Sequence, residues 1–105
     1  RSQGGQSHKG RSQKDFEKNM IEISYAPTFL RQLKALSLEL QEEVVEKTAL
    51  FEDPRNHKVL KVHKLKGRLS GRYSFSVNYR YRIVFCYLSK NEAVLLAIGD
   101  HDVYR

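Results

Sequence analysis

The alternation of apolar and polar residues begins at Met20, and its period then changes along the chain. Residues 20–25 alternate apolar with polar side chains, which predicts a strand. Pro27 suits the first position of a helix. Apolar side chains then recur at helical spacing, at Phe29, Leu33, Leu36 and Leu40. Ser37 is a residue type that favours helix starts, so it separates this first helix from a second one that runs to about Phe51.

Three more strands are predicted in the second half of the chain, at residues 73–77, 81–88 and 93–98. Short turns at residues 78–80 and 89–92 join them. The predicted order is therefore β-α-α-β-β-β. Three consecutive antiparallel strands with a helical hairpin packed on one face would bury a core, which is an α+β fold.

Residues 1–19 differ in composition from the rest of the chain. They are rich in Gly, Ser, Gln and Lys and contain one large apolar residue, Phe16, so they cannot bury enough surface to offset chain entropy. We expect a disordered basic arm, either an expression remnant or an upstream extension, followed by one domain over residues 20–105. The arm supplies +3 of the formal net charge of +7, so it can strengthen binding to a polyanion without belonging to the site.

Length and cysteine content exclude several classes of protein. A chain of 105 residues has room for one small domain. No apolar run, residues 93–98 included, approaches the roughly 20 residues of a membrane-spanning helix. Cys86 is the single cysteine, so neither an intramolecular disulfide nor a metal site of several cysteines can form. We therefore expect a protein of a reducing compartment that has no membrane contact, and we expect no cofactor.

Charge is distributed unevenly along the predicted domain. Residues 54–91 contain ten basic residues and no acidic one, whereas acidic residues gather in residues 39–53. This separation predicts a positive surface that binds phosphate and makes a nucleic acid the leading partner. The alternative is a solvated, lysine-rich loop with basic edge strands that discourage aggregation.

Three side chains are candidates for chemistry. Arg82 lies in an otherwise apolar strand, where an arginine needs either a ligand or an ion pair with a helix glutamate. His101 follows the last strand and is either a catalytic group at a strand end or a solvated loop residue. His63 lies among lysines and could act as a base or contact phosphate. A metal site built from Asp100, His101 and Asp102 has no distinctive spacing, so no metal is expected.

Three segments carry a resemblance to a known family. They are residues 65–74 (LKGRLSGRYS), 81–85 (YRIVF) and 98–105 (IGDHDVYR). In this order they resemble the RelE/ParE superfamily of bacterial toxins, over essentially all of residues 20–105. The resemblance implies a cytoplasmic toxin of a type II toxin–antitoxin system, with a cognate antitoxin as partner. Enzymatic members of the RelE, YoeB and YafQ type cut messenger RNA, commonly in the ribosomal decoding site, whereas ParE-type members inhibit DNA gyrase.

The resemblance also implies roles for individual residues. Arg82 matches the strand arginine of the family and would stabilise the charge on the phosphate. His101 would be the general acid and His63 the general base, and these two roles could be exchanged. Tyr104 matches a carboxyl-terminal tyrosine that would hydrogen-bond the site or stack on a base. The RNA backbone would be held by six basic residues: Lys61, Lys64, Lys66, Arg68, Arg72 and Arg80.

One departure from the RelE pattern affects the chemistry. Ser74 and Ser76 occupy strand positions where that branch tends to carry lysines, so acid and base work would fall to the histidines. The residue set favours a metal-independent mRNA endoribonuclease that depends on the ribosome and inhibits translation. The resemblance implies an antitoxin that masks the site with an acidic or amphipathic helix, laid across the positive face or against the helical hairpin. The alternative is a non-catalytic toxin that inhibits DNA gyrase. The arginine-rich carboxyl-terminal segment associated with that branch is absent.

Overall fold

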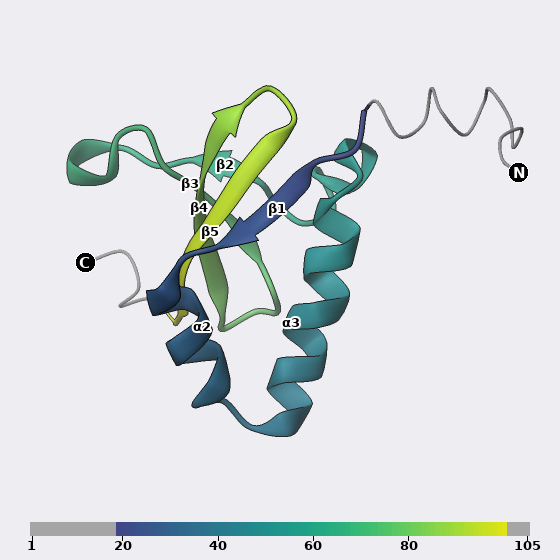
Figure 1. Cartoon of the computed structure of the whole chain (residues 1–105), viewed down its shortest axis with the longest axis vertical. Helices are drawn as coiled ribbons and strands as arrows, with labels where there is room; N and C mark the ends of the chain where they lie inside the picture. Colours follow the sequence, from purple (N-terminus) through teal and green to yellow (C-terminus); the bar gives the residue numbers. More distant parts are fainter. Residues whose placement is uncertain (1–18, 101–105) are drawn as a thin grey trace, which may run out of the picture.

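The computed structural model describes residues 19–100, which form five strands and two helices (Figure 1). The strands are β1 (Glu22–Tyr25), β2 (His63–Lys64), β3 (Tyr73–Ser76), β4 (Arg82–Ser89) and β5 (Glu92–Gly99). The helices are α2 (Pro27–Lys34) and α3 (Leu38–Phe51), and two short 3-10 segments are η1 (Pro54–Asn56) and η2 (Gly67–Leu69). The predicted arm, apart from Asn19, and residues 101–105 lie outside the described residues.

The strands form one mixed sheet in the order β1-β5-β4-β3-β2. β3, β4 and β5 are antiparallel neighbours, which confirms the predicted meander and the α+β class. β1 pairs in parallel with β5, from Glu22 opposite Glu92 to Tyr25 opposite Leu95. The sequence did not predict β2, which pairs antiparallel with β3. A strand of two residues is too short to show a period, so the prediction of four strands was one too few.

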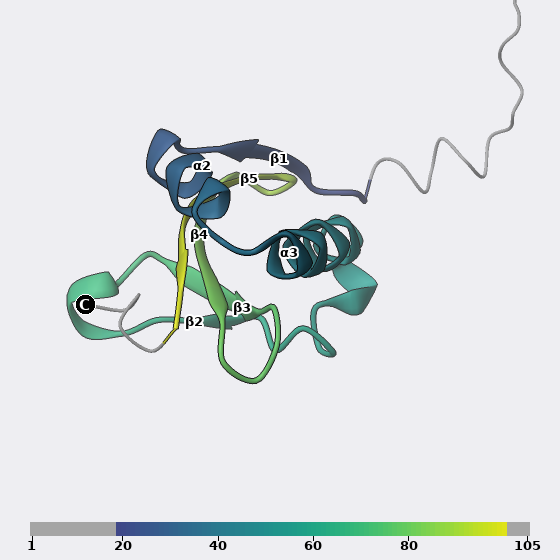
Figure 2. The same cartoon turned by 90° about the horizontal axis from the view of Figure 1, so that it is seen from below.

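The sheet curves around the longer helix. In Figure 2, which views the molecule from below, β1 and β5 lie on one side of α3 and β2 and β3 lie on the other, with β4 between them. α2 packs against β5, where the backbone N–H of Ile98 donates to Oε1 of Gln32 at 2.8 Å. The helices therefore occupy the concave face of the sheet and leave the opposite face uncovered by them.

Side chains from both helices and from the sheet share one core. Phe29 of α2 and Val44 of α3 are buried in the same cluster as the rings of the central strands. Phe51, at the end of α3, stacks on Phe75 with ring centres 4.6 Å apart and meets the edge of Phe85 at 4.7 Å. The predicted packing of a helical hairpin on one face of the sheet is confirmed.

Both helices begin where the sequence predicts. Pro27 is the first residue of α2, where its missing N–H costs nothing. Ser37 caps α3, and its Oγ accepts a hydrogen bond from the backbone N–H of Leu40 at 3.2 Å. Across residues 19–100 no helix has the length and apolar character needed to cross a membrane.

Replacing Gly71 by alanine is expected to lower the free energy of unfolding by about 1–2 kcal/mol, because its φ of 90° is strained for an L residue. No described atom lies within 4 Å of the added Cβ, so the backbone alone would cause the loss. Urea denaturation measures the change. Ser70→Ala, at an exposed neighbour with a φ of −52°, is the control and should stay within about 0.5 kcal/mol of wild type. An equally stable Gly71→Ala variant would contradict this loop conformation.

Candidate functional site

His63 and Arg82 lie on the same face of the sheet, on strands that flank β3. Backbone pairing sets His63 opposite Ser74, and Ser74 opposite Val84 on β4. Arg82, two residues before Val84, lies opposite Ser76. Paired residues of antiparallel strands share a face, and so do alternate residues of one strand. The usual spacings put the Cα atoms of His63 and Arg82 roughly 12 Å apart.

Arg82 is half-buried at the first residue of β4. Its Nη1 donates to the backbone carbonyl of Asn78 at 2.9 Å and to that of Tyr81 at 3.4 Å. It makes no ion pair with any residue that the structure describes, so the expected alternative of a salt bridge to a helix glutamate is not observed. Within residues 19–100 its Nε and Nη2 have no hydrogen-bond partner, which leaves one edge of the guanidinium for an anion.

The ring of His63 is exposed, and the backbone orients it. Its Nδ1 lies 2.9 Å from the carbonyl oxygen of Lys61. A carbonyl can only accept a hydrogen bond, so Nδ1 carries the proton of the neutral ring and Nε2 is the acceptor. Nε2 lies 3.5 Å from Oγ of Ser74, a serine that is fully buried rather than exposed as its polar position in the strand pattern suggests. A neutral His63 can therefore take up a proton at Nε2.

Lys61 is held in a left-handed conformation with a φ of 59°. The N–H of Lys61 donates to the carbonyl of Lys58 at 3.1 Å, and the N–H of Val62 donates to that of His57 at 3.0 Å. This tight turn aims the Lys61 carbonyl at the ring of His63. A positive φ at lysine has no signal in the sequence, so this orienting contact could not be predicted.

The six predicted RNA-binding residues are all exposed and form two groups. Five lie on β2, just before it, or on the loop that follows it: Lys61, Lys64, Lys66, Arg68 and Arg72. Arg80 lies in the turn at the other end of β3, where its Nη2 is 3.9 Å from the carboxylate of Asp100. The structure thus brings five of these residues to the end of the sheet near His63 and sets Arg80 beside Arg82.

The acidic helix and the basic loop lie on opposite sides of the molecule. Glu39, Glu42 and Glu46 are exposed on α3. Figures 1 and 2 both show α3 on one side and the loop between β2 and β3 on the other. A polyanion can therefore contact the loop without approaching the acidic helix.

The tyrosines of the described strands and turns divide into core and surface residues. Tyr73 and Tyr87 pack against each other and against Phe85, and burial, with Tyr73 beside it, raises the pKa of Tyr87 above its ordinary value. Tyr79 is 91% exposed in the turn before β4. It is the tyrosine of this turn that is free to stack on a base.

Two of the four predicted catalytic residues, His101 and Tyr104, lie outside the described residues. The described chain ends at Asp100, directly after β5. Gly99, the last residue of β5, is the backbone neighbour of Arg82. The chain therefore leaves the sheet beside Arg82.

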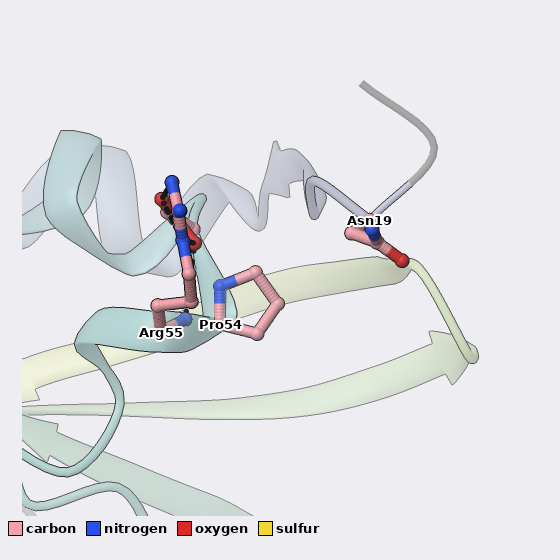
Figure 3. A pocket seen from close by; sticks show the side chains of 4 residues that line it. Asn19, Pro54 and Arg55 are labelled. Carbon is pink, nitrogen blue, oxygen red and sulfur yellow. Dashed lines mark hydrogen bonds and ion pairs between the residues drawn. The ribbon is translucent and has the colours of Figure 1, made fainter. Parts of the chain in front are cut away.

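Away from this face, the described residues form a cavity but no metal cluster. Between residues 19 and 100, no three His, Cys, Asp or Glu side chains lie close enough to hold a metal ion. A cavity of about 290 Å³ lies at the start of η1 and is lined by Asn19, Asp53, Pro54 and Arg55 (Figure 3). The Arg55 guanidinium, 2.7 Å from the Asp53 carboxylate, and the Arg55 N–H hold the pKa of Asp53 below its ordinary value. Neither His63 nor Arg82 lines this cavity.

Several solved structures share this arrangement of helices and strands. The toxin–antitoxin complex RelBE2 from Mycobacterium tuberculosis matches with a TM-score of 0.64 at 20% identity, over 78% of this chain and 99% of that one. The chain has the RelE-like toxin fold. YafQ from Escherichia coli has a TM-score of 0.62 at 15% identity, over 80% of this chain and 97% of that one. The YoeB dimer from Staphylococcus aureus has a TM-score of 0.59 at 22% identity, over 78% and 98%.

The RelE-like fold agrees with the resemblance carried by the sequence motifs, and at these identities it is the fold that the comparison establishes. No protein-family model and no curated protein sequence matches the chain. The match covers 97% or more of each of these three neighbours.

The sequence pattern does not single out one residue near Arg82. It predicts Asn78 only as part of the turn at residues 78–80, whereas the backbone carbonyl of Asn78 holds Arg82 in the structure. The presence of asparagine in a hairpin turn does predict that its side chain accepts hydrogen bonds from nearby backbone N–H groups. The contact to Arg82 has no such signal, since any residue supplies a carbonyl.

Proposed function

We propose that this protein is the toxin of a type II toxin–antitoxin system and that it acts as a metal-independent endoribonuclease on messenger RNA. The observation that carries the proposal is one sheet face with two complementary groups. Arg82 offers a guanidinium edge without a partner among the described residues, and His63 offers a ring nitrogen that can accept a proton. The RelE-like fold and the basic loop after β2 support it. The protein would act in the cytoplasm.

In the proposed reaction the ribose 2′-oxygen attacks the adjacent phosphorus. Nε2 of His63 takes the proton of the 2′-hydroxyl, and Arg82 stabilises the negative charge that builds on the phosphate oxygens. The bond from phosphorus to the 5′-oxygen breaks, and His101 donates a proton to that leaving oxygen. The products are a 2′,3′-cyclic phosphate and a free 5′-hydroxyl. The two histidines could exchange these roles, and Tyr104 would hydrogen-bond the site or stack on a base.

The basic residues would hold the RNA on both sides of the reacting phosphate. Lys61, Lys64, Lys66, Arg68 and Arg72 would contact phosphates near His63, and Arg80 would contact one near Arg82. Such contacts position the strand but do not read its sequence. We propose that the ribosome supplies the remaining alignment of the message.

We propose a cognate antitoxin as the protein partner, because the RelBE2 structure from Mycobacterium tuberculosis and the YoeB–YefM structure from Staphylococcus aureus are complexes. An apolar cavity of about 250 Å³ lies between β1, α2 and α3, and Tyr25, Leu30 and Val45 on its lining are exposed. An antitoxin helix was expected either across the positive face or against the helical hairpin. The exposed apolar lining of this cavity favours the helical hairpin, because it offers apolar contacts to an amphipathic helix.

The proposal is tested by primer extension on a defined messenger RNA in a reconstituted translation reaction, with and without ribosomes. We expect cuts that appear with ribosomes and leave 5′-hydroxyl ends. Intact RNA under every condition, together with inhibition in a gyrase supercoiling assay, would replace the ribonuclease with the non-catalytic alternative.

His101→Ala is expected to lower kcat for RNA cleavage roughly 100-fold, because the leaving 5′-oxygen would lose its proton donor. Primer extension at several enzyme concentrations measures the loss, and circular dichroism checks the fold. His8→Ala, in the predicted arm, removes a histidine far from the site in sequence and should retain wild-type activity. Unchanged cleavage by His101→Ala would remove this residue from the reaction.

A further inference from the structure

We propose that Asn78 is the positioning residue of Arg82 and that helix α3, through Glu43, holds Asn78 in place. This inference rests on the proposed function, because Arg82 is the group that would meet the phosphate. It is carried by a continuous set of hydrogen bonds that runs from α3 through the turn between β3 and β4 to the guanidinium.

The side chain of Asn78 closes this turn. Its Oδ1 accepts hydrogen bonds from the backbone N–H of Arg80 at 2.9 Å and of Tyr81 at 2.8 Å. The carbonyl of Tyr81 in turn accepts from the N–H of Val77 at 2.9 Å. The two carbonyls that hold Arg82, those of Asn78 and Tyr81, are the two ends of the closed turn. Their orientation therefore depends on the Asn78 amide.

The other end of the amide ties the turn to the helix. Nδ2 of Asn78 donates to Oε1 of Glu43 at 2.8 Å, across 35 residues of sequence. Glu43 is half-buried in the middle of α3, whereas Glu42 and Glu46 on the same helix are exposed. A half-buried hydrogen bond to a carboxylate is stronger than one between neutral groups and fixes the turn relative to the core.

These contacts hold one nitrogen of Arg82 and leave the rest of the fork for a ligand. Nη1 is fixed by the two carbonyls, and the edge formed by Nε and Nη2 has no partner among residues 19–100. That edge can bind two phosphate oxygens side by side. Neutral carbonyls hold the guanidinium without cancelling its charge, as a carboxylate partner would.

An amide is required at position 78. Aspartate would still accept from the N–H groups of Arg80 and Tyr81, but it has no donor for Glu43 and would set two carboxylates against each other. It would also place a negative charge near Arg82. Asn78→Asp therefore keeps the size of the side chain and removes the tie to α3.

The experiment compares Asn78→Ala, Asn78→Asp and Glu43→Ala with wild type in the ribosome-dependent cleavage assay. Each should lower kcat about 10-fold or more with a smaller change in KM, because a displaced guanidinium loses mainly transition-state contact. Glu43→Gln keeps the acceptor for Nδ2 and should restore wild-type kcat. Glu46→Ala removes an exposed carboxylate of α3 and is the matched control.

A double-mutant cycle separates positioning from a general structural effect. In the Arg82→Ala background, Asn78→Ala should cause no further fall in kcat, because the group it positions is gone. Independent, multiplied losses would overturn the inference, and so would full activity of Glu43→Ala.

A second readout needs no catalysis. NMR relaxation of the Arg82 Nε–H group should show a more mobile side chain in Asn78→Ala and Glu43→Ala, and wild-type mobility in Glu43→Gln. If wild type cuts no RNA but these changes in mobility occur, the proposed function fails and the positioning of Arg82 stands. If wild type cuts RNA and the mobility of Arg82 is the same in all variants, the positioning fails and the function stands.

Discussion

Arg82→Ala is expected to lower kcat for RNA cleavage by about 10²- to 10³-fold. Removing a preorganised donor from the charge that builds in a transition state typically has an effect of this size. Here the loss should be large because the guanidinium is already oriented by the carbonyl of Asn78 at 2.9 Å and has an edge directed to no other described group. Initial rates of cleavage over a range of message concentrations give kcat, and single-turnover cleavage of ribosome-bound message gives the rate of the chemical step.

Two comparisons make this result specific. Arg82→Lys keeps the charge but not the planar fork, so its activity should lie between those of wild type and Arg82→Ala. Arg31→Ala removes one positive charge from the exposed surface of α2, where Arg31 contacts Thr28, and should cut RNA at the wild-type rate. If Arg82→Ala and Arg31→Ala cut equally well, Arg82 takes no part in the reaction.

Phe51→Ala is expected to lower the free energy of unfolding by about 3–5 kcal/mol. Phe51 is fully buried and lies between the rings of Phe75, Phe85 and His57, with ring centres 4.6–4.7 Å away. Truncation would leave a cavity at the point where α3, η1 and the sheet meet. Domains of this kind are stable by only about 5–15 kcal/mol, so the variant should be partly unfolded at physiological temperature.

Urea denaturation followed by circular dichroism measures this loss. Val45→Ala removes a side chain that is 63% exposed on the same helix and should change stability by less than about 0.5 kcal/mol. A loss below about 1 kcal/mol for Phe51→Ala would mean that the aromatic cluster does not form the centre of the core.

The order of the elements follows from local patterns in the sequence. Each of these patterns depends on neighbours within a few residues. They are the alternation over residues 20–25 and 73–77, the helical spacing through Phe51, and the helix-start residues Pro27 and Ser37. Such patterns decide which residues are buried by a strand or a helix, so the α+β class and the helical hairpin could be predicted. The observed ends of β4 and β5 differ by one residue from the predicted ends, because the last residues of a strand add little to its periodic pattern.

The pairing of β1 and of β2 could not be predicted in the same way. The parallel neighbours β1 and β5 are the first and last strands in the sequence, although they are adjacent in the sheet. β2 forms because His63 and Lys64 pair with the edge of β3. These backbone pairings depend on the tertiary fold and have no sequence pattern of their own, since every residue type offers the same backbone carbonyl and almost every type the same N–H.

The candidate site shows the same difference between what local sequence predicts and what the tertiary fold sets. The candidate side chains could be chosen from residue identity alone, because an arginine in an apolar strand and histidines among lysines are unusual wherever the chain folds. The folded chain sets His63 and Arg82 on one face, directs Nδ1 of His63 to the carbonyl of Lys61 and ties Arg82 to α3 through Asn78. The orientation of the His63 and Arg82 side chains comes from backbone carbonyls, and for Arg82 also from a contact between residues 35 positions apart. No local pattern in the sequence indicates such contacts.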